Sequence, residues 1–111
     1  MTDDLIPVLG NPVSVAEVEA RLREHAAVAE AAVVGMPDAF TGFALKAFVR
    51  LTPSAQAAPG ELVDFCRRRL PAHAYPRQIE LVESLPHTTS GEIDRRRLGD
   101  HELARMRRTP R

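Results

Sequence analysis

Apolar residues recur at helical spacing in two segments, and each segment has its own start signal. In the first, Ser14 and Glu17 form a capping box, which predicts a helix that extends to about His25. The second begins at Pro59, because proline is favoured in the first turn of a helix, and ends before Pro71. The apolar faces consist of Val15, Val18 and Leu22 in the first helix and of Leu62, Val63, Cys66 and Leu70 in the second.

Three other segments have the composition or alternation of β-strands. Residues 27–36 are small and β-branched, which is typical of a buried strand, and this strand is expected to stop at Pro37-Asp38. Residues 44–51 alternate, which predicts a second strand, antiparallel to the first, with Lys46 on a solvated face. A third strand is expected within residues 78–84.

The order of these elements predicts the fold class. Residues 1–13 contain short apolar runs separated by proline and glycine, which favours an extended hairpin over a helix. Hairpin, helix, two strands, helix and strand together predict an α+β fold, with a small three-stranded sheet and flanking helices. We divide the chain into this lead-in, a domain of residues 14–98 and an arginine-rich tail of residues 99–111, which is expected to fray at its end.

Composition limits the compartment and the chemistry. A chain of 111 residues with 44% hydrophobic residues has room for one small core. Cys66 is the only cysteine, which excludes an intramolecular disulfide and fits a reducing compartment. The acidic N-terminus does not resemble a secretory signal and no apolar run is long enough for a membrane span, so we expect a cytoplasmic protein. The four histidines have no metal-ligand spacing, and no metal site is expected.

Positive charge is concentrated in the second half of the chain. Fifteen basic and fifteen acidic residues cancel overall, but residues 65–111 carry eleven basic and six acidic residues. An arginine-rich tail attracts nucleic-acid phosphates. No aromatic residue follows Tyr75, however, so the tail offers no surface on which bases could stack. Nucleic acid or another anionic ligand remains a third and less favoured partner.

Six segments, in the same order, resemble the C-terminal domain of the adenylate-forming superfamily, which includes acyl-CoA synthetases, peptide-synthetase adenylation domains and luciferases. The resemblance covers about residues 3–98 and implies the fold of that domain. The matching segments are Asp3 to Ile6, Gly10 with Val13 to Glu19, Val28 to Asp38, Lys46 to Val49, Tyr75 to Arg77 and Leu85 to Leu98.

The resemblance implies a mobile lid that is not catalytic alone. In that family a large N-terminal adenylation domain holds ATP, Mg and the carboxylate, and the lid turns about a hinge that corresponds to Asp3. One lid pose makes an acyl-adenylate, and the other transfers the acyl group to the thiol of CoA or of a carrier-protein pantetheine. The resemblance therefore implies an N-terminal domain, in cis or in trans, and implies no cofactor bound by this domain alone.

The sequence departs from the family at the position that matters most for the first step. Family members usually carry Pro-Lys-Thr-x-Ser-Gly-Lys, and the second lysine reaches the substrate carboxylate and the α-phosphate. Here the segment from Pro86 ends in Gly91-Glu92, and His87 replaces the first lysine. Loss of one such cation commonly costs about 100- to 1000-fold in rate, and Glu92 adds repulsion. Adenylation by this lid is therefore expected to be very poor.

Other positions carry weaker expectations. The resemblance places Gly10 and Asn11 in the loop that lines the thiol passage, although a tight turn alone also explains the glycine. Arg67 or Arg68 resembles a contact to the nucleotide phosphate of CoA, although charge at the end of a helix explains both arginines as well. An alternative function is a stand-alone interaction module that acts in trans on an adenylation domain or carrier protein.

Overall fold

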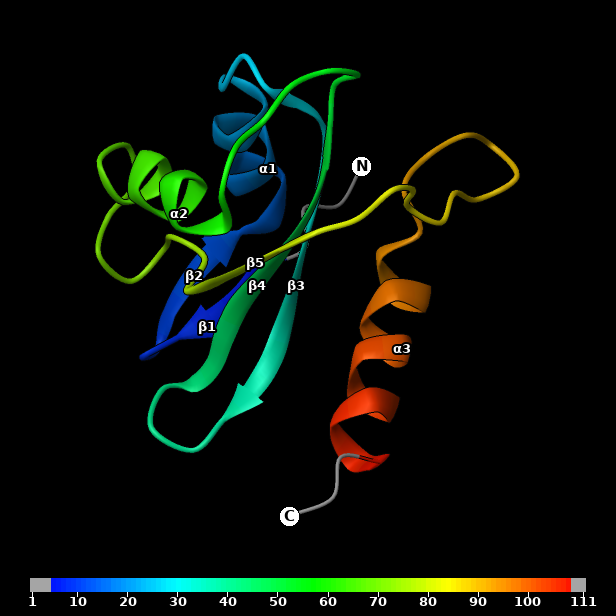
Figure 1. Cartoon of the computed structure of the whole chain (residues 1–111). Helices are drawn as coiled ribbons and strands as arrows, with labels where there is room; N and C mark the ends of the chain where they lie inside the picture. The colour runs from blue at the N-terminus through cyan, green and yellow to red at the C-terminus, as the bar shows by residue number, and fades with distance from the viewer. Residues whose placement is uncertain (1–4, 109–111) are drawn as a thin grey trace.

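The computed structural model describes the backbone of residues 5–108 and the side chains of residues 5–106. It contains two sheets and three helices (Figure 1). The elements are β1 (Leu5–Val8), β2 (Asn11–Ser14), α1 (Val15–Arg23), β3 (Val28–Asp38), β4 (Gly42–Leu51), α2 (Pro59–Arg67), β5 (Gln78–Leu81) and α3 (Arg95–Arg108). The expected α+β fold with a three-stranded sheet is confirmed. None of the helices in the described range is long and apolar enough to cross a bilayer.

The lead-in is an antiparallel hairpin of β1 and β2, as expected. Leu9 and Gly10 form its two-residue turn, and both have positive φ, 53° and 79°. Two consecutive positive φ values match the twist of the flanking strands. The turn therefore favours glycine at position 10 for conformational reasons alone. Ser14 then caps α1 by accepting a hydrogen bond from the backbone N–H of Glu17, as the capping box predicted.

The main sheet has the order β3-β4-β5, with an antiparallel pair followed by a parallel one. β3 ends at Asp38, as the expected stop at Pro37-Asp38 indicated, but Pro37 is itself part of the strand and lies opposite Phe43. The backbone N–H of Val33 donates to the side chain of Glu19, which lies outside the sheet. Backbone groups alternate in direction along a strand, so the nitrogen of Pro37, four residues later, also points away from β4. A proline at a free edge removes no ladder hydrogen bond.

One face of the sheet is covered by α1, α2 and the hairpin. The larger core cluster lies there, and it is built from the apolar helix faces that the spacing predicted. Leu22, Leu62 and Cys66 are completely buried in it, against Ala47 and Val49 of β4. This face contains most of the apolar area that the domain removes from water.

The other face of the sheet is covered by α3, most of which belongs to the segment assigned to the arginine-rich tail. A smaller cluster of Ala32, Val34, Met36, Phe48 and Leu85 packs there against Leu98 and Leu103. The helix runs without interruption across the expected boundary between residues 98 and 99.

Lys46 illustrates the consequence of this second cover. Lys46 lies on the opposite face of the sheet from Ala47, as expected. The prediction that this face is solvated is wrong, because α3 covers Lys46 and leaves only 4% of it exposed. Its Nζ lies 2.5 Å from Glu102 of α3 and 3.0 Å from Glu80 of β5. Arg105 completes the group by pairing with both carboxylates. We call these four residues the Lys46 cluster.

Candidate functional site

Residues 86–94 form a narrow loop that projects from the body of the domain before α3, and we call it the Glu92 loop (Figure 1). Its two strands are joined by hydrogen bonds from the N–H of Thr88 to the carbonyl of Glu92, 2.7 Å, and from the N–H of Asp94 to the carbonyl of Pro86, 2.8 Å. His87 and Ile93 form a β-bridge between them. The loop is therefore a small hairpin and not an irregular segment.

The turn of this hairpin exposes the carboxylate of Glu92. Gly91 has φ 92°, a conformation that favours glycine, and its N–H donates to the carbonyl of Thr88. The hydroxyls of Thr88 and Ser90 lie 2.9 Å apart and support the turn. Within the described part of the chain, the Glu92 side chain is exposed and forms no hydrogen bond or ion pair. A free negative charge is thus presented beside the turn.

One stem of the loop is held at the surface. Nε2 of His87 lies 3.0 Å from Glu30 of β3, and the other carboxylate oxygen of Glu30 accepts from Arg50 of β4 at 2.9 Å. The hydrogen bond from Arg50, followed by that from His87, holds the pKa of Glu30 below its usual value. This anchor is half exposed and open to screening by salt.

The other stem is held in the interior. Arg95, the first residue of α3, donates two hydrogen bonds to the carboxylate of Glu19, at 2.6 and 2.5 Å. Glu19 belongs to α1, is 1% exposed, and also accepts from the N–H of Val33 at 2.8 Å. The sequence reasoning missed this pair. The signal was a carboxylate four residues after Val15, on the apolar face of α1.

The predicted thiol-passage residues lie at the opposite end of the sheet. Gly10 lies in the turn of the first hairpin and Asn11 begins β2, and the N–H of Leu9 donates to the carbonyl of Thr41 in the turn between β3 and β4. Oδ2 of Asp38 accepts hydrogen bonds from Thr41 and Phe40, and these bonds lower the pKa of Asp38. The two hairpin tips therefore form one fixed surface.

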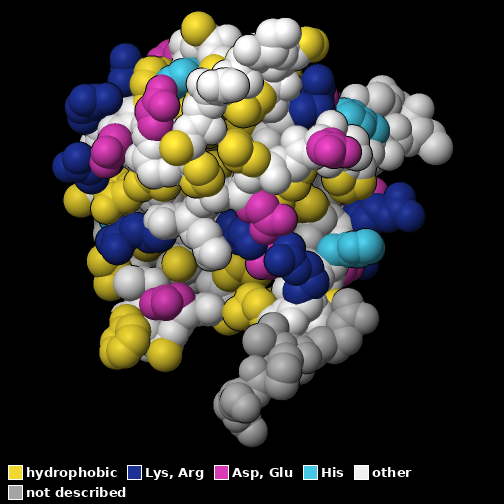
Figure 2. Space-filling view, viewed as in Figure 1, with side chains coloured by type: hydrophobic (Ala, Val, Ile, Leu, Met, Phe, Trp, Pro, Cys, Tyr) yellow, Lys and Arg dark blue, Asp and Glu magenta, His cyan; other side chains and the backbone are white. Residues whose placement is uncertain are grey.

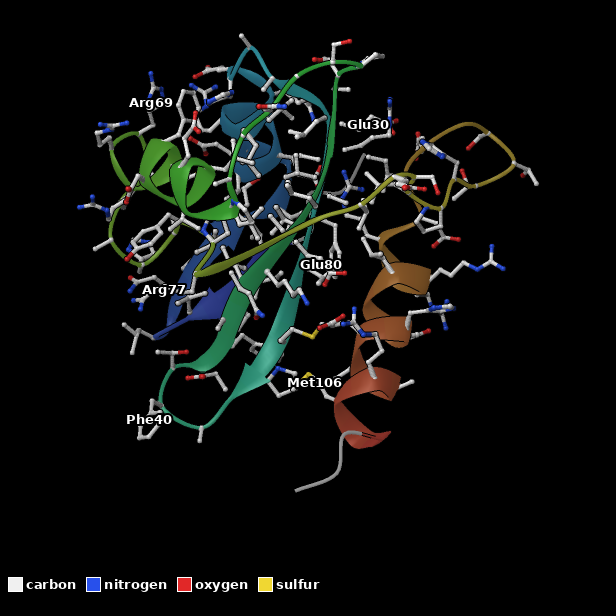
Figure 3. All side chains as sticks on the ribbon, in the orientation of Figure 1. Glu30, Phe40, Arg69, Arg77, Glu80 and Met106 are labelled. Carbon is white, nitrogen blue, oxygen red and sulfur yellow. The ribbon has the colours of Figure 1, made fainter. Side chains whose placement is uncertain are left out.

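This surface is apolar. Phe40 is 92% exposed and Leu9 is 59% exposed. Figure 3 places Phe40 at the outermost point of the turn, and Figure 2 shows exposed hydrophobic atoms there. We call the combined tips of the two hairpins the Leu9–Phe40 end.

Arg67 and Arg68 both lie at the C-terminal end of α2, but their surroundings differ. Arg67 pairs with Asp64 one turn earlier at 3.2 Å. Arg68 is the C-cap residue of α2, and among the described residues its exposed side chain has no ion-pair partner. Arg69 lies over the ring of Phe65, 3.7 Å from its centroid. Of the two candidates, Arg68 is the one without an ion-pair partner among the described side chains.

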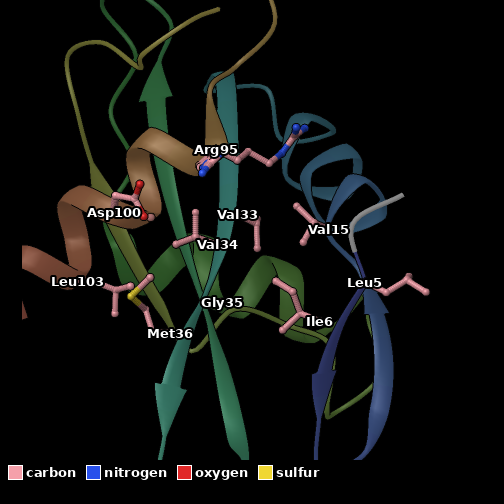
Figure 4. Close-up of a pocket in the computed structure, with 12 residues that line it drawn as sticks. Leu5, Ile6, Val15, Val33, Val34, Gly35, Met36, Arg95, Asp100 and Leu103 are labelled. Atoms are coloured by element: carbon pink, nitrogen blue, oxygen red, sulfur yellow. The ribbon is translucent and has the colours of Figure 1, made fainter. Parts of the chain in front are cut away.

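The predicted site residues do not form one cleft within this domain. The Glu92 loop, the Leu9–Phe40 end and the arginines of α2 occupy three separate regions of the surface (Figures 1 and 3). Asp3, the expected hinge, lies outside the described residues. A shallow groove of 480 Å³ between β1, β3 and α3 is lined by apolar residues of the strands and by Arg95, Arg96 and Asp100 of α3 (Figure 4). No described residues form a group of three or more metal ligands.

The sequence and the fold both have known relatives. Residues 17–92 match the AMP-binding enzyme C-terminal domain family. An acetyl-coenzyme A synthetase of Mycolicibacterium smegmatis is 47% identical over 102 residues, which are 88% of this chain and 11% of that protein. A human mitochondrial acyl-coenzyme A synthetase, ACSM1, is 40% identical over 110 residues, which are 95% of this chain and 19% of that protein.

A solved structure agrees with these sequence relatives. The acyl-CoA synthetase of Brucella canis superposes with a TM-score of 0.87 at 42% identity, over 96% of this chain and 20% of that one. The chain thus spans between a tenth and a fifth of the length of these relatives. The residues matched and the shared fold show that this chain belongs to the AMP-binding enzyme C-terminal domain family of adenylate-forming enzymes.

Proposed function

We propose that this chain is the mobile C-terminal lid of an acyl-CoA synthetase-like enzyme and works only with a large N-terminal adenylation domain. The relatives named above support this proposal, because most of their length lies outside the matched segment. The three dispersed surface regions also support it, since each needs a second surface to become a site. ATP, Mg and the acyl acceptor, CoA or a pantetheine, would be held mainly by that second domain.

The Glu92 loop carries the first part of the proposal. A rigid hairpin that exposes one charged side chain is suited to bring that charge into a site on another domain. In the family a lysine there neutralises the carboxylate and the α-phosphate during adenylation. Glu92 instead brings a negative charge to anionic substrates, and at short range in a closed site this repulsion raises the barrier. The lid is thus proposed to be deficient in adenylation.

The Leu9–Phe40 end and α2 carry the second part. Transfer of the acyl group to a thiol needs the other lid pose, in which the Glu92 loop is withdrawn. The turn at Leu9 and Gly10 is fixed by its hydrogen bond to Thr41, and it would line the thiol passage without using Glu92. Arg68, the C-cap residue of α2, has no ion-pair partner in the part of the chain that the structure describes, and it would contact a phosphate of CoA in preference to Arg67. We therefore propose that thioester formation is the half-reaction this lid retains.

The test replaces the matching segment of the mycobacterial acetyl-coenzyme A synthetase with this chain. Carboxylate-dependent pyrophosphate exchange reports adenylation, and conversion of added acyl-adenylate to thioester reports the second step. The Glu92→Lys variant is expected to exchange about 100- to 1000-fold faster than the parent chimera, with thioester formation unchanged. Glu92→Gln, which removes the charge without adding a cation, separates loss of repulsion from gain of attraction.

A parent chimera that exchanges pyrophosphate as fast as its Glu92→Lys variant would overturn the proposed role of position 92. A chimera that forms no thioester from added acyl-adenylate would overturn the retained second half-reaction. Supplying the N-terminal domain as a separate protein shows whether the lid also works in trans.

A further inference from the structure

Glu19 is the most deeply buried acidic residue in the described part of the chain, and it is hydrogen-bonded to the base of the Glu92 loop. It is 1% exposed, and its carboxylate accepts three hydrogen bonds, two from Arg95 and one from the backbone of Val33. The two bonds from Arg95 come from Nε and Nη2, so the guanidinium and the carboxylate meet in parallel, side by side. Figure 4 shows Arg95 reaching from the start of α3 toward α1.

This pair has a direct mechanical connection to position 92. Arg95 follows Asp94, whose N–H donates to the carbonyl of Pro86 across the two stems of the loop. Two residues further out, Thr88 donates to the carbonyl of Glu92 itself. Because these bonds hold both strands together, the direction of the whole hairpin depends on where its stems leave the domain.

The two stems are held with unequal strength. The contact between His87 and Glu30 is exposed, and it pairs a histidine that carries charge only when protonated. The Glu19–Arg95 pair combines a permanently charged guanidinium, whose side chain is 35% exposed, with a Glu19 side chain that is 2% exposed. A buried ion pair adds little net stability compared with apolar residues of the same size, but it fixes the geometry of both partners.

We propose that Glu19 is a positioning residue for the Glu92 loop and that it acts through Arg95. This inference rests on the proposed function, in which the loop enters the site of an adenylation domain. Glu19 joins three elements, since it lies in α1, bonds to β3 and clamps the first residue of α3. It sets the angle at which the side chain of residue 92 leaves the domain, and its partner Arg95 transmits that angle.

The first test measures geometry and needs no catalysis. Spin labels are attached in the 111-residue chain at Glu92→Cys and at Ala16→Cys, an exposed position on α1. Cys66 is buried and does not compete for the label. The parent is expected to give one narrow distance distribution between the labels. Arg95→Lys keeps the charge and loses the parallel pair of hydrogen bonds. This variant is expected to give a broad distance distribution in place of the single narrow one.

Arg96→Lys is the matched control, because it makes the same chemical change at the next residue, which is exposed. It is expected to leave the distribution unchanged. Glu19→Gln keeps an oxygen for the N–H of Val33 and provides a second variant if Arg95→Lys lowers the melting temperature too far. A distribution in both Arg95→Lys and Glu19→Gln as narrow as in the parent would overturn the proposal.

The second test separates positioning from a general structural role. In the chimera carrying Glu92→Lys, Arg95→Lys is expected to lower kcat for pyrophosphate exchange on the order of 100-fold, because misplacement of a reacting group by about 1 Å has that effect. KM for ATP and the rate of thioester formation are expected to stay the same. Equal loss of both half-reactions would show a merely structural role and would overturn the proposal.

The two tests fail separately. If Glu92→Lys brings no exchange to the chimera, the proposed function of position 92 fails, while the distance measurement still decides whether Glu19 and Arg95 fix the loop.

Discussion

The two faces of the central sheet are covered in different ways. On the first face, α1 and α2 contribute apolar side chains only at their points of contact, apart from Glu19, and Leu22 and Leu62 are completely buried. On the second face, Leu98 and Leu103 of α3 pack against a small apolar cluster, and Glu102 and Arg105 of α3 join the Lys46 cluster of ion pairs. Figure 2 shows acidic and basic side chains next to each other between β5 and α3. The first cover is held by apolar burial, and the second combines apolar burial with complementary charge.

The largest expected effect comes from removing apolar volume on the first face. Leu22→Ala is expected to lower the free energy of unfolding by about 2–5 kcal/mol, because Leu22 is completely buried and its neighbours collapse only partly. Leu103→Ala makes the same change on the second face, where the side chain is only partly buried, and is expected to cost less than about 2 kcal/mol. Urea unfolding measures both. Equal costs would contradict the distinction between the faces.

The second prediction concerns the buried charge of the other face. Glu102→Leu is expected to cost about 2 kcal/mol in the parent, because Lys46 then keeps only the partly exposed Glu80 as a close partner. In a Lys46→Met background the same change is expected to cost less than about 1 kcal/mol, because no buried charge is left behind. A double-mutant cycle by urea unfolding gives the coupling energy. A coupling near zero would show that the cluster does not hold α3.

These two faces also explain what the sequence could and could not predict about the fold. The helix from residue 15, its cap at Ser14 and the turn at Gly10 depend on residues close in sequence, and all three expectations are confirmed. Lys46 was misjudged because alternation shows only that it lies opposite to Ala47. Whether that face is exposed to solvent depends on α3, which brings Glu102, 56 residues later in the sequence, over Lys46. The sequence of α3 has few apolar residues at helical spacing, so it did not indicate that this helix packs on the sheet.

The same limit applies to the candidate site. The family resemblance located the Glu92 loop and the turn at Gly10, since both are short motifs. The resemblance could not show how the loop is held. Glu19 and Arg95 are 76 residues apart, and no sequence motif contains both of them. A charged residue on an apolar helix face was the only local sign of that contact.

The third prediction tests the exposed stem of the loop by pH. Arg50 and His87 hold the pKa of Glu30 below its usual value, so its ionised form is favoured in the folded protein. The stability that this provides is present above the unfolded pKa, near 4.5, and is lost as the pH falls through the lower folded pKa. Glu30→Gln is expected to cost up to about 1 kcal/mol at pH 6 and progressively less as the pH falls below about 4.5 toward pH 3.

Urea unfolding at several pH values measures this difference. Glu83→Gln is the control, because Glu83 is exposed and has no ion-pair partner among the described residues. A cost of Glu30→Gln that stays constant between pH 6 and pH 3 would show that the pairing with Arg50 and His87 contributes nothing.

The smallest expected effect is on the alkylation rate of Cys66, on the first face, when the second face is loosened by Glu102→Leu. Burial raises the pKa of the Cys66 thiol to about 11, and only the thiolate reacts with an alkylating reagent, so labelling at pH 8 requires α2 to open. If the faces open separately, Glu102→Leu loosens α3 and leaves the labelling rate of Cys66 unchanged. If Cys66 reacts only through global unfolding, the loss of about 2 kcal/mol accelerates labelling about 30-fold. We expect the unchanged rate, because α2 contacts α1 and β5 while α3 packs on the opposite side of the sheet.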